Sequence, residues 1–215
     1  MPNSWTGVGE LQDIGDFIKE NGTLFSFQKK EYVFRESSYG CYVFVIERGL
    51  VKTVRNNEEG KEITTALFTT NDVFGLGALI KEHPFLESAM AIQDCTIYGI
   101  STKDFIRFIE HTPKLSITLI KMLTESISVH NEHLLDIAYA SVRKKVAHTI
   151  LQFAQVMELK ENDRLLVTRN ELASVAGITS ETMIRTLNEF KKEGLLDINH
   201  RTILLGNLER LKEID

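Results

Sequence analysis

Residues 168–187 read TRNELASVAGITSETMIRTL, and this stretch decides the fold of the C-terminal part of the chain. Two short helices are expected, Asn170–Ala176 and Ser180–Glu193, with Gly177 between them where a tight turn needs a positive φ. Ala173 is small where two helices would cross, and Thr179 can cap the second helix. A small apolar core is supplied by Leu172, Ile178, Met183 and Leu187. The pattern predicts a helix-turn-helix, although a generic corner between two helices shares most of these requirements.

The exposed face of the second predicted helix carries Glu181 and Arg185, four residues apart and therefore on one side. A carboxylate can accept a hydrogen bond from the amino group of cytosine, and a guanidinium can bond guanine with two hydrogen bonds. The same spacing also makes a surface salt bridge worth a few tenths of a kcal/mol. From the residues alone, the salt bridge is the more common of these two interpretations.

The residues around this stretch extend the same domain. An apolar stripe predicts a helix before it, formed by Val142, Val146, Ile150, Phe153, Val156 and Met157. The polar residues Glu158–Arg164 predict a loop, and Asn199-His200-Arg201 predicts the turn of a hairpin. Arg143, Lys144 and Lys145 form a small basic cluster at the start of the helix, which is all that binding of phosphate needs locally.

Between Pro113 and Ala140 the apolar residues follow a heptad pattern with spacings of 3, 4, 3, 4 and 3. The positions of this seam are Ile120, Leu123, Ile127, His130, Leu134 and Ile137. The pattern is typical of a long helix that packs against a second copy of itself, so it predicts a homodimer. The alternative is one amphipathic helix lying on its own domain. Leu119, Met122 and Leu135 lie off the seam and could face that domain.

The N-terminal part, from about Leu24 to Ile100, has the character of a β domain. Short segments rich in β-branched and aromatic residues predict strands at Tyr32–Phe34, Tyr42–Ile46, Leu50–Val54, Ile63–Phe68 and Thr96–Ile100. Turn signals separate these segments, which is typical of a barrel or sandwich. A helix is expected before them, with Leu11, Ile14, Phe17 and Ile18 on one face.

Composition sets the remaining bounds. Hydrophobic residues make up 43% of the chain, and the net charge is −5. The acidic excess lies before Ser141, because the chain from Ser141 onward holds 12 Lys and Arg residues and 11 Asp and Glu residues. No apolar run is long enough to span a membrane, and residues 1–10 lack the basic-then-apolar pattern of a secretory signal. Cys41 and Cys95 match no metal or disulfide framework, so a reducing cytoplasm is expected.

Three stretches resemble the Crp/Fnr family of bacterial transcription regulators. They are Asn56–Ile63, then Asn71–Gly75 together with Ser88–Cys95, and Thr168–Leu187 as the most specific. The resemblance runs from about Leu24 to Leu205. It implies an α+β fold in three parts: a β-roll (double-stranded β-helix) like that of cyclic-nucleotide-binding domains at 1–112, a dimerisation helix at 113–140, and a winged helix-turn-helix at 141–215.

The resemblance also implies roles for particular residues. Base reading falls on Glu181 and Arg185, whereas Ser180 stands where the family's cyclic-AMP receptors have a further base-contacting arginine. The expected target is double-stranded DNA with a TGA-type core in an inverted repeat. Candidate phosphate contacts are Thr168, Arg169, Thr179 and Thr182. Alternatively, the two threonines of the second helix only cap it, and Arg169 pairs with Glu171 or Glu193.

Cyclic AMP is not expected as a ligand. The family's cyclic-AMP binders use a Gly-Glu pair for the ribose and an Arg-Ser pair for the phosphate, but here Leu76 follows Gly75. No arginine occurs from Asn56 to Ile106, and the residues before Ala89 include Phe85, Leu86 and Glu87. A buried phosphate needs a cation or many donors, and this stretch offers an acid and apolar groups.

Other cofactors are not expected either. An oxygen-sensing iron–sulfur cluster needs several cysteines near the N-terminus, and none precedes Cys41. Candidate axial ligands for haem are Pro2, His83, His111 and His130, residues that more often lie at the surface or in packing. His130 and His133 are one helical turn apart but lack a third ligand for a metal.

Whether the β-roll holds a small effector stays open at this point. An apolar or weakly polar molecule could sit near Gly75, Leu76, Ala89, His130 and Asn131, or the roll could be filled by its own side chains. In a dimer, two copies of Ser180–Glu193 would lie one turn of DNA apart, about 34 Å, with Tyr139–Arg143 as the hinge. RNA polymerase is an expected partner, and the loop Glu158–Arg164 could meet it or simply be solvated.

Two other classes of protein compete with a DNA-binding regulator. A cupin-like metal enzyme would need a His-x-His motif on its strands, and the predicted strands contain no histidine. A protein-interaction module would use the C-terminal domain to bind a partner protein. The expectation is therefore a regulator without enzymatic activity.

Overall fold

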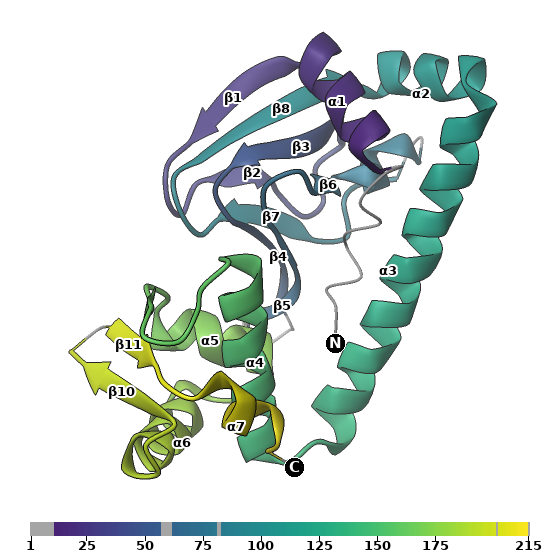
Figure 1. Ribbon diagram of the computed structural model, residues 1–215. Coiled ribbons are helices and arrows are strands. Elements are labelled where there is room, and N and C mark those ends of the chain that lie inside the picture. Colours follow the sequence, from purple (N-terminus) through teal and green to yellow (C-terminus); the bar gives the residue numbers. More distant parts are fainter. Residues whose placement is uncertain (1–10, 57–61, 81–82, 201, 215) are drawn as a thin grey trace. The chain divides into compact units, whose positions relative to one another are not determined.

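The computed structural model describes residues 11–56, 62–80, 83–200 and 202–214, which form two compact units, Met1–Val129 and His130–Asp215. The boundary between the units falls within the long helix α3 (Pro113–Tyr139), drawn in teal in Figure 1. The fold is α+β, as predicted, and each unit has its own core. No helix among the described residues is long and apolar enough to cross a membrane.

The first unit is built on two four-stranded antiparallel sheets. One sheet has the order β1 (Thr23–Phe27), β8 (Cys95–Ser101), β3 (Tyr42–Arg48) and β6 (Val73–Phe74). The other has the order β2 (Tyr32–Phe34), β7 (Ser88–Ala91), β4 (Val51–Asn56) and β5 (Glu62–Phe68). The five predicted strands are confirmed, whereas β1, β6 and β7 were not among them.

Side chains from both sheets meet in an apolar core between the sheets. Its members include Phe44, Ile46, Val51, Phe68, Phe74, Ala89, Ala91 and Ile97. A second core lies on the other face of the first sheet and contains Val43, Val45 and Ile100 with residues of three helices. These helices are α1 (Leu11–Asn21), α2 (Thr102–His111) and the start of α3. Strand β3 is therefore buried on both faces, which explains its unbroken apolar run Val43–Ile46.

Helix α1 packs as its spacing predicts, because Ile14 and Ile18 are fully buried and Phe17 stacks on Phe108 of α2. In the first half of α3, Met122 is buried and Leu119 packs against the same core, also as expected. Leu135 belongs to the second unit and is 59% exposed.

The second unit packs four helices with a small antiparallel sheet. The helices are α4 (Val142–Val156), α5 (Arg169–Ala176), α6 (Ser180–Lys192) and α7 (Leu208–Lys212). The sheet has the order β10 (Leu196–Asn199), β11 (Thr202–Leu205) and β9 (Arg164–Leu165). Figure 1 shows the two strands of the hairpin, β10 and β11, in yellow. The β10–β11 hairpin is the predicted one, while α7 and β9 were not predicted, and Arg201 lies outside the described residues.

The stripe of α4 supplies much of this unit's core through Val146, Ile150 and Phe153, which are fully buried. Val142 was expected in the same stripe but is exposed, because it is the first residue of the helix after the Ser141 cap. The polar segment after α4 is a loop as predicted, except that Arg164 already belongs to β9.

Asp72, in the turn between β5 and β6, provides a test of the first unit. Its carboxylate accepts a hydrogen bond from the Thr69 amide (2.7 Å), yet burial raises the pKa of Asp72 from 3.8 to about 7. The folded state therefore favours the protonated carboxyl group of Asp72. This group does not lower the free energy of unfolding below about pH 4, but it lowers that free energy progressively as the pH rises to about 7. Asp72→Asn is expected to raise the free energy of unfolding at pH 8 by on the order of 2 kcal/mol.

Urea denaturation at pH 4 and pH 8 measures this difference. Asp197→Asn is a control of opposite sign, since the hydrogen bond from Lys191 (2.7 Å) lowers the pKa of Asp197 and makes its charged form stabilising at pH 8. A gain in stability for Asp72→Asn that is equal at both pH values would contradict the assignment of a raised pKa.

Candidate nucleic-acid interface

Helix α5 begins with a capping box. The Thr168 hydroxyl accepts a hydrogen bond from the Glu171 amide (3.2 Å), and the Glu171 carboxylate accepts one from the Thr168 amide (2.7 Å). This arrangement fixes the start of the helix and uses the side chain of Thr168, one of the predicted phosphate contacts. The helix ends at Gly177, whose φ of 63° is the positive value that the sequence predicted.

Helix α6 follows after only three residues. Thr179 caps it by accepting a hydrogen bond from the Thr182 amide (3.2 Å), and the two hydroxyls lie 2.9 Å apart. The capping interpretation of these two threonines is thus realised in the structure. Thr179 remains exposed at the helix N-terminus, where backbone N–H groups attract anions such as phosphate.

One side of α6 is buried and the other faces outward. Met183, Thr186, Leu187 and Phe190 are buried. The outward side carries Glu181, Ile184, Arg185 and Asn188. Among the described residues, Glu181 and Arg185 form no ion pair with each other, so the salt-bridge interpretation is not realised in the structure. Both groups are available to a partner.

Ser180, at the first turn of α6, is oriented by the neighbouring helix. Its hydroxyl donates a hydrogen bond to the side-chain carbonyl of Asn170 on α5 (2.7 Å). Asn170 is exposed, and its amide nitrogen keeps two donor hydrogens that Ser180 does not use. The role of Asn170 was not predictable from the sequence, because the contact joins residues on two helices.

Arg169 lies beside Ser180's partner Asn170 at the start of α5 and is half-buried. Its guanidinium lies 3.5 Å from the carbonyl oxygen of His200 in the β10–β11 turn, and burial lowers the pKa of Arg169. Glu193, one of the two acids expected to pair with Arg169, is bound instead by Arg143.

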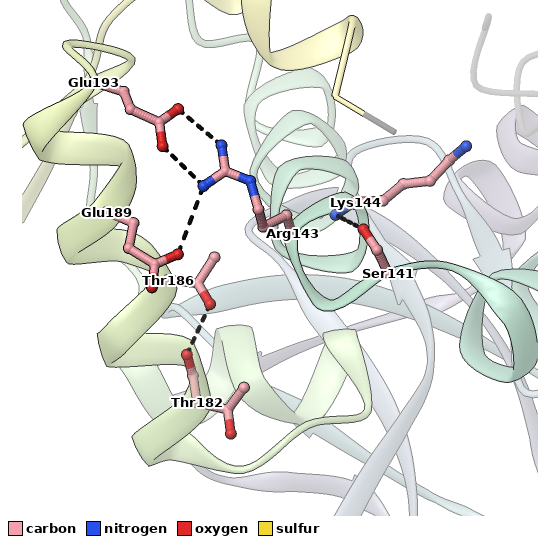
Figure 2. A network of polar contacts seen from close by, with 7 residues as sticks. All are labelled: Ser141, Arg143, Lys144, Thr182, Thr186, Glu189 and Glu193. Atoms are coloured by element: carbon pink, nitrogen blue, oxygen red, sulfur yellow. Dashed lines mark hydrogen bonds and ion pairs between the residues drawn. The ribbon is translucent and has the colours of Figure 1, made fainter.

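Arg143 holds the C-terminal half of α6 in place (Figure 2). Its two terminal nitrogens donate to the two carboxylate oxygens of Glu193 at 2.8 Å each, and Glu189 lies 3.6 Å away. The guanidinium also sits 5.1 Å from the centre of the Phe190 ring. The hydrogen bonds from Arg143 lower the pKa of Glu193. Part of the basic cluster at residues 143–145 is thereby neutralised, and Arg143 positions α6 rather than adding free positive charge.

The residues expected near a small effector are distributed over both units. Ala89 is buried in the core between the sheets, whereas Leu76, in the short helix η1 (Leu76–Leu79), packs in the core on the other face of the first sheet. The two side chains lie in separate clusters because the turn at Gly75 (φ 79°) redirects the chain. The other two predicted members, His130 and Asn131, belong to the second unit.

Aromatic side chains occupy the space between the sheets. Phe85, 7% exposed, stacks on Phe34 with ring centres 3.9 Å apart, and Phe44 stacks on Phe74 at 5.3 Å. This stacking was not foreseen, since Phe34 and Phe85 are far apart in the sequence.

The side chains of Glu87 and Ser88 also form hydrogen bonds within the first unit. Glu87 accepts a hydrogen bond from the Thr65 hydroxyl (2.5 Å), and the Thr65 hydroxyl lies 2.7 Å from that of Thr53. The Ser88 hydroxyl accepts a hydrogen bond from the Glu36 amide (2.9 Å). The Glu87 carboxylate and the Ser88 hydroxyl are therefore both engaged within the first unit.

Within the described ranges, no group of three or more His, Cys, Asp or Glu residues could hold a metal ion. Cys41 is exposed and Cys95 is buried, and burial raises the pKa of the Cys95 thiol. Of the other residues considered as ligands, His83 is exposed and lies after η1, His111 ends α2, and Pro2 lies outside the described residues.

Two family models match the chain. A cyclic nucleotide-binding domain matches residues 24–112, and a Crp-like helix-turn-helix domain matches residues 144–214. A CRP-like cAMP-activated global transcriptional regulator of Mycobacterium tuberculosis is 26% identical over 189 residues, which cover 86% of this chain and 84% of that protein. The Cyclic AMP receptor protein of Thermus thermophilus is 24% identical to this chain, and the match covers 89% of each of the two proteins.

Solved structures share the fold. FixK2 from Bradyrhizobium japonicum has a TM-score of 0.78 at 23% identity, and the match covers 90% of this chain and 97% of that one. A CRP/FNR-family transcriptional regulator from Thermus thermophilus has a TM-score of 0.76 at 22% identity, covering 89% and 97%.

Proposed function

The chain belongs to the Crp/Fnr family of transcription regulators, and we propose that it is a homodimer that binds an inverted repeat with a TGA-like core. The observation that carries this proposal is the outward side of α6. Glu181 and Arg185 are exposed there, unpaired with each other, on a helix that is held by its buried side and by Arg143. These are the requirements for reading base edges in the major groove.

The residues around α6 would position it on the DNA backbone. Thr179 and Thr182 lie at its N-terminus, and Thr168 and Arg169 lie at the N-terminus of α5. Phosphate contacts of this kind fix orientation without specifying sequence. Ser180, which is bonded to Asn170, would contribute little base reading of its own, so we propose that the half-site is less constrained at its position.

The dimer would form along α3. In the described part of the predicted seam, Ile120, Leu123, Ile127 and Leu134 are exposed, and His130 is half-buried. The opposite alternative, a helix whose apolar stripe covers only its own domain, leaves Ile120, Leu123, Ile127 and Leu134 exposed. The side chain of Ile137 lies outside the described residues. A second copy of the chain would bury this seam and place two α6 helices about 34 Å apart.

We propose that the β-roll does not bind cyclic AMP, and isothermal titration is expected to show no binding of micromolar or better affinity. Leu76 replaces the acid expected for a ribose, Glu87 replaces the cation expected for a phosphate, and aromatic side chains fill the roll. The variant Leu76→Glu with Glu87→Arg is the matched comparison, since it introduces both missing groups. Micromolar affinity in the unmodified protein would refute the proposal.

The polar loop Glu158–Arg164 was expected either to meet RNA polymerase or to be solvated. Of the polar loop, Glu161 accepts a hydrogen bond from the Leu208 amide (3.0 Å) and Asp163 accepts one from the Lys160 amide (2.7 Å). Two of its carboxylates thus stabilise the domain, which favours the solvated-loop interpretation over a contact with RNA polymerase. RNA polymerase remains the partner we propose for the regulator, through a surface other than these side chains.

An enzymatic role is not proposed. The described strands carry no histidine, so they offer no His-x-His motif of the cupin-like alternative. The direct test is to select bound sequences from a random DNA pool and to measure the purified protein by native mass spectrometry. An enriched inverted repeat and a dimeric mass are expected. A pool without enrichment would overturn the proposal, and a bound small molecule would identify an effector.

A further inference from the structure

Ile184 is exposed in the middle of α6, and packing does not explain it. Its side chain is 46% exposed, while the buried side of the helix consists of Met183, Thr186, Leu187 and Phe190. A β-branched side chain also loses rotamer freedom in a helix, so isoleucine is not favoured at an exposed helical position for local reasons. The methyl groups of Ile184 are therefore accessible to a partner of α6.

The neighbours of Ile184 define the surface to which it belongs. Glu181 precedes it by three residues, Arg185 follows it directly, and Asn188 follows by four. Glu181 and Asn188 lie on the same side of the helix as Ile184, because they are three and four residues away, and Arg185 lies on the same side as Glu181 at a spacing of four. All four residues are exposed. Ile184 is therefore an apolar element between the two charged groups that are proposed to read bases.

The major groove offers one apolar group on its base edges, the C5-methyl group of thymine. Glutamate and arginine match hydrogen-bonding groups, but the isoleucine side chain ends in methyl groups and matches only this methyl. A protein partner would need a larger apolar area than a single side chain between two charges provides. The chemistry of this surface therefore favours a thymine.

Building on the proposed function, we infer that Ile184 contacts a thymine methyl group and specifies that base in each half-site. One helical turn rises about 5.4 Å and base pairs are spaced by about 3.4 Å, so the thymine lies within about two base pairs of those read by Glu181 and Arg185. Ile184 is then a specificity-determining residue of this chain.

The test replaces each thymine of the selected DNA site with deoxyuridine, in both half-sites at once, which removes only the methyl group. One position is expected to lose about threefold to fivefold in affinity per half-site, the effect of one buried methyl group. Ile184→Ala is expected to bind the thymine and deoxyuridine forms of that position equally. Ile184→Val, which keeps a branched apolar end, is expected to retain the discrimination.

Asn188→Ala is the matched control, because it alters the same side of α6 and should leave the deoxyuridine effect unchanged. Circular dichroism verifies that each variant is folded. If no thymine position responds, or if Ile184→Ala keeps the full response, the inference is wrong, while loss of binding in Glu181→Ala and Arg185→Ala would still support the proposed function. If the unmodified protein selects no DNA sequence, the proposed function fails and this inference fails with it.

Discussion

Arg185→Ala is expected to weaken binding to the selected DNA site by at least about 30-fold. A guanidinium that bonds guanine at two atoms contributes roughly 1–3 kcal/mol of discrimination, and a dimer loses this contact in both half-sites. Glu181→Ala is expected to act in the same direction and to relax the preference at a different base pair. Fluorescence anisotropy with labelled DNA measures both affinities, and a repeated selection with each variant shows which position has lost its preference.

Two substitutions serve as controls for charge and for fold. Arg107→Ala removes an exposed arginine of α2 in the other unit, and Glu209→Ala removes an exposed acid of α7. Neither is expected to change the affinity for the site by more than about twofold. If Arg185→Ala and Glu181→Ala leave specific binding unchanged, α6 does not read the DNA. The alternative, a C-terminal domain that binds a partner protein, would then be favoured.

Ile127→Asp is expected to separate the homodimer, raising its dissociation constant by at least about 100-fold. Ile127 is 62% exposed in the chain and lies in the middle of the described seam of α3. In a dimer the seam would be buried, and the two introduced carboxylates would have to lose water without a partner of opposite charge. Sedimentation velocity over a range of concentrations measures the change.

Ser128→Asp is the matched control, because Ser128 is exposed, adjoins Ile127 and lies outside the seam. It should leave the dimer intact while adding the same charge. Affinity for the inverted repeat should fall with Ile127→Asp, since a single chain reaches only one half-site. A dimer that resists Ile127→Asp but is broken by Ser128→Asp would place the interface on another side of α3.

The helix-turn-helix was predictable because its determinants are local. Gly177 has the positive φ required by a two-helix turn, and Thr168 and Thr179 cap the helices whose starts they precede. The apolar seam of α3 could be predicted for the same reason, because residues three and four apart lie on the same face of a helix. The five predicted strands between Tyr32 and Ser101 followed from their β-branched and aromatic residues and from the turn residues that separate them, whereas short strands such as β6 carry too few residues for a pattern.

The contacts that hold the site were not predictable in this way. Arg143 and Glu193 are 50 residues apart, and Arg143 was expected only to add positive charge. The contact of Ser180 with Asn170 and the stacking of Phe34 on Phe85 likewise join separate elements. A periodic pattern indicates which side of an element is apolar, but it does not indicate which side chain of another element will meet it.

The sequence by itself therefore determined the kind of fold, the helix that carries Glu181 and Arg185, and the seam that suits a second copy of the chain. Only the tertiary structure decided that Glu181 and Arg185 stay unpaired, that Arg143 serves α6, and that Ile184 is exposed beside them. The physical reason is that helix and strand patterns arise from interactions within a few residues, whereas pairing and exposure depend on long-range packing of the whole unit.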